Sequence, residues 1–173
     1  MYIDIKDNIV WSPIGDESRP GVWVPINFSS VTSKGLEVIL NYNKKVGRNT
    51  FLLTSNYSYT LAIDNETEKE LIFTPKHLFN MNLSYAYKRF SSYIQYLYTG
   101  SVYTTEDNLK IDGFYLPAFG VANMGCKYKL IQTKEQQLSL GVQVNNMFDT
   151  YYETSPRRPM PNRNFNITIN YKF

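Results

Sequence analysis

The sequence predicts an all-β fold, an antiparallel up-and-down arrangement of about eight strands, on the basis of three observations. Apolar and polar residues alternate over most of the 173-residue chain, and a period of two is typical of strands with one apolar and one polar face. No stretch shows a convincing helical period. The connections between the expected strands are alternately short and long, which places every long loop at one end of the sheet.

Eight segments carry this alternation, and several are longer than the usual globular strand of about five or six residues. They cover residues 2–11, 31–44, 50–62, 77–88, 91–103, 114–130, 136–147 and 164–173. The long connections cover 12–30, 63–76, 104–113 and 148–163. A weak repeat supports the arrangement, because every second strand ends in Tyr followed closely by Lys. The four pairs are Tyr42 and Lys44, Tyr87 and Lys88, Tyr128 and Lys129, and Tyr171 and Lys172.

The residues on the two faces indicate that lipid surrounds the apolar one. In the strands with clear registers, the apolar face consists of large aliphatic and aromatic residues such as Leu83, Leu140 and Ile167. The other face is mostly Asn, Ser, Thr and Gln, as expected of a wet lumen, whereas a soluble sheet would usually carry more Lys and Glu there. Lipid forces every strand to be paired, which requires a closed barrel.

Aromatic residues are expected at both ends of the strands. The chain holds 15 Tyr, 10 Phe and 2 Trp, and amphipathic rings favour the headgroup zone at each surface of a bilayer. We expect Tyr57 and Tyr59 near one surface. The ring expected near the other surface consists of Tyr42, Tyr85, Tyr87, Tyr128, Tyr171 and Phe173. The sequence therefore predicts a transmembrane β-barrel segment, and it has no run of 18 apolar residues that would form a membrane helix.

Composition argues against several classes of function. A net charge of +3, without a block of Lys or Arg, argues against a nucleic-acid partner. The one cysteine, Cys126, rules out a disulfide framework within the chain and a Cys-based zinc site. With His77 as the one histidine, neither a His-rich metal site nor a Ser-His-Asp triad is expected. We therefore predict no cofactor, no metal site and no catalytic residue, and the protein is not predicted to be an enzyme.

The last expected strand ends in two aromatic residues of its apolar face, Tyr171 and Phe173. This ending resembles the recognition signal that the outer-membrane barrel assembly machinery reads. In physical terms, the signal is an edge strand that stays unpaired until the barrel closes and that can pair with the edge of another sheet. Outer-membrane lipid and the assembly machinery are thus expected partners.

Several motifs resemble those of TonB-dependent outer-membrane receptors. Residues 145–151 (NNMFDTY) follow the family pattern N-(L/M)-F-D-x-x-Y. Residues 158–165 (RPMPNRNF) follow R-P-x-P-G-R-x-F, with Asn162 in place of the usual Gly, a change that also tolerates a positive φ. The segments 33–37 (SKGLE) and 73–80 (FTPKHLFN) also resemble the family, so that the resemblance covers nearly the whole chain.

The resemblance implies a 22-stranded barrel in the Gram-negative outer membrane, plugged by an N-terminal domain. Such receptors import scarce ligands, for example ferric siderophores, haem, cobalamin or glycans, with energy passed from the inner membrane. The R-P-x-P segment resembles siderophore and cobalamin receptors more than the large glycan importers. The resemblance also implies that the long loops are extracellular, that the C-terminus is periplasmic, and that the first, third, fifth and seventh strands run outward.

Eight strands do not enclose a plug, so residues 1–173 are expected to form the C-terminal part of such a barrel, with the plug domain absent. TonB would then act only through the missing N-terminal region, and the chain alone is not expected to transport its ligand. Residues 1–7 have neither the basic nor the apolar region of a signal peptide. Either the protein stays inside the cell or the chain is not the whole mature protein: a truncated gene product, a fragment or one piece of a split protein.

Two groups of charged loop residues are candidates for a site. Arg157, Arg158 and Arg163 in the last long loop could meet an anionic ligand or lipopolysaccharide phosphates, although loop solubility is the default explanation. Asp64, Glu66, Glu68 and Glu70 cluster with Lys69 in another long loop. They lack the spacing of a calcium loop, so a solvated loop is the preferred interpretation.

Two further architectures remain open at this point. The first is a complete eight-stranded outer-membrane barrel with a structural or adhesive role, which requires pairing between residues 2–11 and 164–173. The second is a soluble β-barrel that binds a small apolar ligand inside, which requires the apolar face to point inward.

Overall fold

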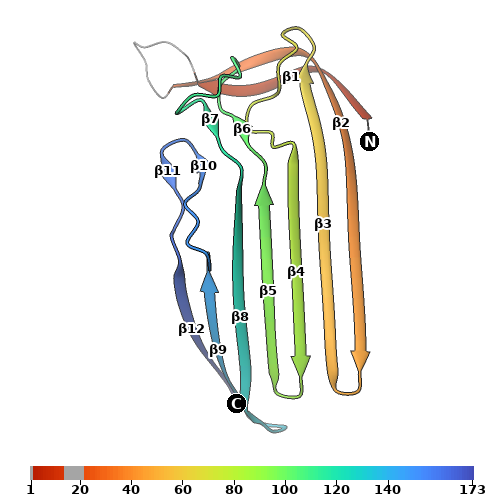
Figure 1. Cartoon of the computed structure of the whole chain (residues 1–173), viewed down its shortest axis with the longest axis vertical. Helices are drawn as coiled ribbons and strands as arrows, with labels where there is room; N and C mark the ends of the chain where they lie inside the picture. Colours follow the sequence, from red (N-terminus) through yellow and green to blue (C-terminus); the bar gives the residue numbers. More distant parts are fainter. Residues whose placement is uncertain (1, 14–21) are drawn as a thin grey trace.

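The computed structural model describes residues 2–13 and 22–173, which form one eight-stranded antiparallel sheet with two small hairpins beside it (Figure 1). The strands of the sheet are β1 (Tyr2–Pro13), β2 (Trp23–Val46), β3 (Asn49–Asp64), β4 (His77–Tyr87), β5 (Phe90–Thr99), β8 (Phe119–Gln132), β9 (Gln137–Asn145) and β12 (Asn164–Lys172). The hairpins are β6 (Val102–Tyr103) with β7 (Tyr115–Leu116), and β10 (Glu153–Ser155) with β11 (Arg158–Pro159). None of the described residues forms a helix long and apolar enough to cross a membrane.

The meander confirms the predicted all-β, up-and-down fold. Every strand of the sheet pairs with its predecessor in the order β1-β2-β3-β4-β5-β8-β9-β12. The short turns between β2 and β3, between β4 and β5, and between β8 and β9 share one end of the sheet, which we call the plain end (Figure 1). The connections 65–76, 100–118 and 146–163 share the opposite end, which we call the loop end.

The register keeps the apolar row continuous from strand to strand. One line of directly paired residues runs Tyr42, Leu53, Leu83, Ile94, Met124, Val144, Phe165. We call the side of the sheet that carries this line the outward face, and the opposite side the polar face. A neighbouring line on the polar face runs Asn41, Thr54, Asn82, Gln95, Asn123.

Outward side chains are exposed, as with Leu36 at 60% and Ile167 at 73%. The described sheet therefore has no sealed apolar centre, which removes the soluble barrel with an inward apolar face.

The ends of the sheet do not meet. Among the described strands, no pairing joins β1 to β12, and β12 pairs with β9 alone. The self-closed eight-stranded barrel required that pairing, so the structure gives this alternative no support.

The position of β1 corrects the sequence-based expectation. A strand at 2–11 was expected, followed by a loop over 12–30 and a second strand at 31–44. Instead β2 begins at Trp23, and β1 pairs only with Trp23–Lys34 of that strand, whereas β3 pairs with Val31–Val46. The two partners of β2 thus overlap only at Val31–Lys34, and β1 continues past the loop end as a ribbon (Figure 1). Residues 14–21 of the expected loop lie outside the described part.

Two expected strands are also too long. The segment 91–103 ends as a sheet strand at Thr99, and the segment 114–130 joins the sheet only at Phe119. The residues between them pair with each other, Val102 with Leu116 and Tyr103 with Tyr115. Pro117 explains part of the break, because proline has no N–H to donate to a strand ladder.

Two tyrosines cover glycines on the neighbouring strand. Tyr93 of β5 pairs with Gly125 of β8, and a Cβ added at Gly125 would lie 2.5 Å from Cε1 of Tyr93. The hydroxyl of Tyr96 covers Gly120 in the same way on the outward face. A glycine in a strand interior often marks such a close approach.

Candidate functional site

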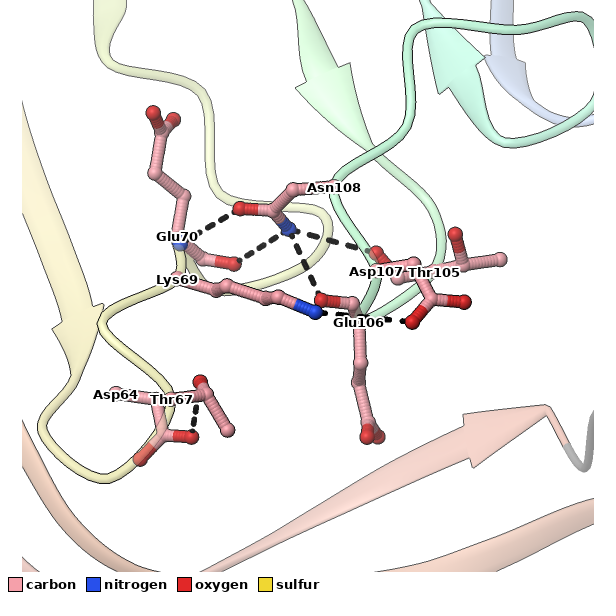
Figure 2. Close-up of polar contacts among 8 residues, drawn as sticks. All are labelled: Asp64, Thr67, Lys69, Glu70, Thr105, Glu106, Asp107 and Asn108. Carbon is pink, nitrogen blue, oxygen red and sulfur yellow. Dashed lines mark hydrogen bonds and ion pairs between the residues drawn. The ribbon is translucent and has the colours of Figure 1, made fainter.

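At the loop end, the side chain of Asn108 links the connection 65–76 to the connection 100–118, beside a backbone hydrogen bond from the N–H of Phe73 to the carbonyl of Tyr103 at 2.8 Å. Figure 2 shows Asn108 between the two loops: its Oδ1 accepts the backbone N–H of Glu70 at 2.8 Å, and its Nδ2 donates to the carbonyl of Glu70 at 3.1 Å. Asn108 has a φ of 55°, a conformation that asparagine tolerates better than most residues. The side-chain amide of Asn108 thus bonds both backbone groups of Glu70, as a neighbouring strand would. Lys69 adds an ion pair with Asp107 at 3.7 Å.

Two acidic residues in and beside the connection 65–76, Asp64 and Glu70, act as a turn cap and an ion-pair partner. Asp64 is buried, and its carboxylate accepts the N–H of Glu66 at 3.1 Å and the hydroxyl of Thr67 at 2.6 Å. Glu70 pairs with Lys76 at 2.6 Å. In the described part of the chain, no group of three or more His, Cys, Asp and Glu is arranged to hold a metal ion.

The pair of Glu70 and Lys76 makes a pH-dependent prediction. The hydrogen bond from Lys76 to Glu70 raises the pKa of the Lys76 ammonium above 10.5, and desolvation opposes the rise. Because the folded value is the higher one, the stabilisation is fully present below pH 10.5 and is lost as the pH rises through the folded pKa. We expect Glu70→Gln to return the pKa of Lys76 toward its ordinary value, measured by NMR titration of labelled lysine side chains. An unchanged pKa in the variant would contradict this cause.

The last long loop begins at a buried turn around Asn146, which is 2% exposed and has a φ of 48°. Its Oδ1 accepts the N–H of Thr150 at 2.9 Å, and its Nδ2 donates to the carbonyls of Thr150 at 2.8 Å and Pro161 at 3.4 Å. Asp149 then accepts the backbone N–H of Arg163 at 2.7 Å, directly before β12 begins. The NNMFDTY motif therefore joins the two ends of the loop and fixes where β12 starts.

A cleft of about 430 Å³ lies between this loop and the connection 100–118. Four aromatic rings contribute to its lining: Tyr115, Phe119, Tyr151 and Tyr152. Phe119 and Tyr152 pack with their ring centroids 4.5 Å apart. Asp112, Glu153 and Arg157 add charged groups to the lining. Aromatic walls with a few charged groups are typical of sites for small organic ligands.

Glu153 holds two parts of this cleft in place. The hydroxyl of Tyr151 donates to its Oε1 at 2.6 Å, and the backbone N–H of Arg157 donates to its Oε2 at 2.9 Å. The first hydrogen bond raises the pKa of Tyr151. Both carboxylate oxygens are thus occupied, and Arg157, with a φ of 61°, is fixed at the tip of the β10–β11 hairpin.

The three candidate arginines have different surroundings. Arg157 lines the cleft. Arg158 is exposed in β11, and Arg163 lies before β12, where its Nη1 is 3.5 Å from the carbonyl of Met147. The structure therefore brings Arg157 alone of the three together with the aromatic lining. Sequence reasoning missed Tyr115, Phe119, Tyr151, Tyr152 and Glu153, although the YYE run beside Arg157 was a signal that could have drawn attention to them.

The aromatic residues expected at the membrane surfaces lie on the outward face, at the heights that the registers give them. Tyr57 pairs with Phe79, and its hydroxyl shares a 2.9 Å hydrogen bond with Nδ1 of His77; Tyr59 pairs with His77. The plain-end group holds Tyr42, Tyr85, Tyr87, Tyr128 and Tyr171, and Phe173 follows β12 with its ring centroid 6.0 Å from that of Tyr171. Their roles at a bilayer surface and in assembly stay predictions.

A family model and the curated relatives of the chain agree on one family of proteins. The model of the family described as TonB dependent receptor-like, beta-barrel matches residues 1–147. The vitamin B12 transporters BtuB of Photobacterium profundum and Vibrio vulnificus are each 24% identical to the chain over 98% of its length. The chain spans 26% of the length of either relative.

Solved structures show the same fold. The closed form of the ferric-catecholate import receptor Fiu from E. coli K12 has a TM-score of 0.72 at 19% identity, covering 99% of this chain and 24% of Fiu. The ferripyoverdine receptor of the outer membrane of Pseudomonas aeruginosa has a TM-score of 0.69 at 16% identity, with 99% and 24% covered. These relatives are named as transporters and receptors. By the family match over residues 1–147, this chain belongs to the TonB-dependent receptor-like β-barrel family, a family of outer-membrane receptors.

Proposed function

We propose that the chain is the C-terminal barrel part of a receptor that takes up a scarce small ligand, such as a ferric siderophore, haem or cobalamin. The names of the relatives support this class, because they include vitamin B12 transporters and receptors for ferric catecholate and ferripyoverdine. In the proposed orientation the loop end is extracellular and the plain end is periplasmic. TonB and the plug belong to a region outside these 173 residues, so uptake requires the whole receptor.

The observation that carries this proposal is the aromatic cleft at the loop end of a sheet whose outward face is apolar. An exposed apolar face of this size requires a non-aqueous surrounding, because each buried Å² of apolar surface contributes about 25 cal/mol. The lipid-facing sheet then presents the cleft on the extracellular side. In this site Tyr115, Tyr151 and Tyr152 provide stacking surfaces, and the guanidinium of Arg157 faces an anionic part of the ligand.

We expect Arg157→Gln to weaken binding of an anionic ferric siderophore by the whole receptor by about tenfold, because a charge-assisted hydrogen bond contributes roughly 1.5–3 kcal/mol. Binding is measured by quenching of the receptor's intrinsic fluorescence, with cobalamin titrated in parallel. Arg158→Gln is the matched control, since Arg158 lies next in the chain but outside the cleft lining, and a change below about twofold is expected. Equal losses in the two variants would remove the cleft from the proposed site.

Assembly is part of the same proposal. The edge of β12 away from β9 has no partner among the described strands, and Phe173 is 92% exposed. We infer that Tyr171 and Phe173 are read by the barrel assembly machinery when this edge is templated.

A further inference from the structure

The aromatic cleft at the loop end carries two opposite charges that have no partner in the described part of the chain. Asp112 and Arg157 both contribute to its lining. Among the described residues, no hydrogen bond or ion pair reaches the carboxylate of Asp112 or the guanidinium of Arg157. The third charged group of the lining, Glu153, is already engaged by the hydroxyl of Tyr151 and by the backbone N–H of Arg157. One negative and one positive group are therefore left for a ligand.

Asp112 lies in a tight turn that the fold holds in place. The turn closes with a hydrogen bond from the N–H of Phe114 to the carbonyl of Ile111 at 3.1 Å. Gly113, with a φ of 82°, occupies the third position of the turn, where a type II turn requires a positive φ. Thr104 is buried beneath the turn, and its hydroxyl donates to the carbonyl of Gly113 at 2.9 Å. The turn therefore presents Asp112 as an exposed carboxylate at a defined position.

Arg157 lies on the other wall of the cleft, in the turn of the β10–β11 hairpin. Its backbone N–H is held by Glu153 at 2.9 Å, and its φ is 61°. The guanidinium takes no part in this turn. The two free charges thus stand on separate turns, each fastened by its own hydrogen bonds. Groups that are held in place before binding lose less conformational entropy when a ligand arrives.

The charges of the lining do not suit a ligand that is only anionic. An anion that reaches Arg157 shares the cleft with the carboxylates of Asp112 and Glu153, and like charges at close range disfavour binding. The pKa of Tyr151 is raised chiefly by its hydrogen bond to Glu153 and in part by the charge of Asp112. The charge of Asp112 therefore acts close to a ring on which a ligand can stack. A cationic group on the ligand would replace this repulsion by attraction.

The space between the two charges is aromatic. Tyr115, Tyr151 and Tyr152 contribute rings to the lining, and the volume of about 430 Å³ lies within the range of about 300–1,000 Å³ that is usual for small-ligand pockets. Because Asp112 and Arg157 do not contact each other, a ligand must extend from one wall to the other to reach both. A stacked ring with oppositely charged substituents on its two sides has this shape.

We propose that the cleft selects a dipolar ligand group, an aromatic ring that carries one cationic and one anionic substituent, with Asp112 contacting the cation and Arg157 the anion. Asp112 is then a residue that determines specificity. The inference rests on the proposed function, since the cleft must be the ligand site, and it narrows the ligand from an anionic to a dipolar class. Charge-assisted hydrogen bonds at both ends also fix the orientation of the ring.

The test uses four forms of glycyltyrosine, which share one phenol ring and differ in the charge of their two ends. The unmodified dipeptide is dipolar, the N-acetylated form is anionic, the C-terminal amide is cationic, and the doubly blocked form is neutral. The ends of the extended dipeptide lie about 7 Å apart. Dissociation constants are measured by saturation-transfer NMR with the whole receptor in zwitterionic micelles. We expect the dipolar form to bind at least about fivefold more tightly than each of the other three.

Two substitutions with matched controls assign the two contacts. Asp112→Asn should bring the dipolar and the N-acetylated forms within about twofold of each other, because it removes the partner of the cation. Glu68→Gln removes a carboxylate of the same loop end that is outside the cleft lining, and it should leave the preference within about twofold of the wild type. Arg157→Gln should remove the preference over the C-terminal amide, and Arg158→Gln should not.

Three outcomes would overturn the inference: equal binding of the four forms, no binding of any form to the wild-type receptor, or equal effects of Asp112→Asn and Glu68→Gln. Circular dichroism of each variant shows whether the sheet is retained. Asp112→Ser, which removes the same charge, replaces an Asp112→Asn variant that does not fold.

The failure of this inference is distinguishable from the failure of the proposed function. If Arg157→Gln weakens binding of an anionic ferric siderophore while Asp112→Asn changes the affinity of none of the four dipeptide forms, the cleft is an anion site and dipolar selection is wrong. If neither substitution changes the binding of the siderophore or of the dipeptides, the cleft is not the ligand site and both proposals fail.

Discussion

Leu83→Arg should destabilise the protein in a bilayer, lowering its free energy of unfolding by about 2–4 kcal/mol, the cost of an arginine at the lipid face near the bilayer midplane. Leu83 lies in the interior of β4, and its direct partners Leu53 and Ile94 are also apolar. A guanidinium at this position has no polar partner in the outward row, so it must either remain in hydrocarbon or reach a distant surface. The measurement is reversible unfolding by guanidinium chloride in phosphatidylcholine vesicles.

Asn80→Arg is the control for this experiment, because Asn80 lies three residues earlier in β4 and on the polar face. There the added charge meets the lumen side, and the expected change is below about 1 kcal/mol. If both arginines destabilise the protein by the same amount, the assignment of the two faces is wrong. If Leu83→Arg is the milder change, the apolar row faces a protein interior and the membrane interpretation fails.

Asn146→Ala should destabilise the last long loop by about 3 kcal/mol, from two causes. The change leaves the half-buried N–H of Thr150 without its acceptor, which costs about 1–3 kcal/mol, and it places alanine in a left-handed conformation, which adds roughly 1 kcal/mol. The start of β12 should then be released, since the same turn positions Asp149 for Arg163. Proteolysis of the loop 146–163 measures the release of the loop, and chemical unfolding of the chain measures the loss of stability.

Asn146→Gly separates these two causes, because glycine keeps the freedom for a positive φ while removing the amide. We expect the Asn146→Gly variant to lose about two thirds as much stability as Asn146→Ala. Asn166→Ala, an exposed asparagine of β12, should change the stability by less than about 0.5 kcal/mol. A similar effect of the substitutions at 146 and 166 would mean that the hydrogen bonds of Asn146 do not hold the loop.

The sheet itself could be predicted because each strand carries its own signal. Alternation is complete in β12 and nearly complete in β4, where Leu78 at the start of the strand lies on the polar face. The outward and polar rows, the order of the strands and the plain-end turns all follow from it. The family could be inferred as well, since the motif at 145–151 and the segment at 158–165 are local in sequence.

The boundaries of β2 could not be predicted in the same way. Pro25, Ser29 and Ser30 resemble a loop, yet pairing with β1 extends the strand back to Trp23. That extension depends on a partner that is distant in the sequence, and a local pattern contains no information about it. The hairpins β6–β7 and β10–β11 have two or three residues per strand, too few for alternation to be visible.

The cleft could not be predicted either, because its lining residues come from segments that are distant in the sequence. Tyr115 and Phe119 belong to one connection and its following strand, whereas Tyr151 and Tyr152 belong to another connection. The pairing of β8 with β9 brings the two connections together. Arg157 was a candidate because of its charge, but Arg158 and Arg163 were candidates for the same reason. The distinction between them comes from the hairpin that fixes Arg157 beside aromatic rings.

The tyrosine that covers Gly125 has a consequence for how this sheet can evolve. Positions 93 and 125 are coupled: a β-carbon at 125 would lie 2.5 Å from Cε1 of Tyr93, so a larger residue at 125 requires the tyrosine ring to move or to be replaced by something smaller. Related sequences should therefore show a large residue at 93 with glycine at 125, or a small residue at 93 with freedom at 125. A lineage that carries bulk at both positions must have turned the side chain at 93 away from β8 or moved the two strands apart.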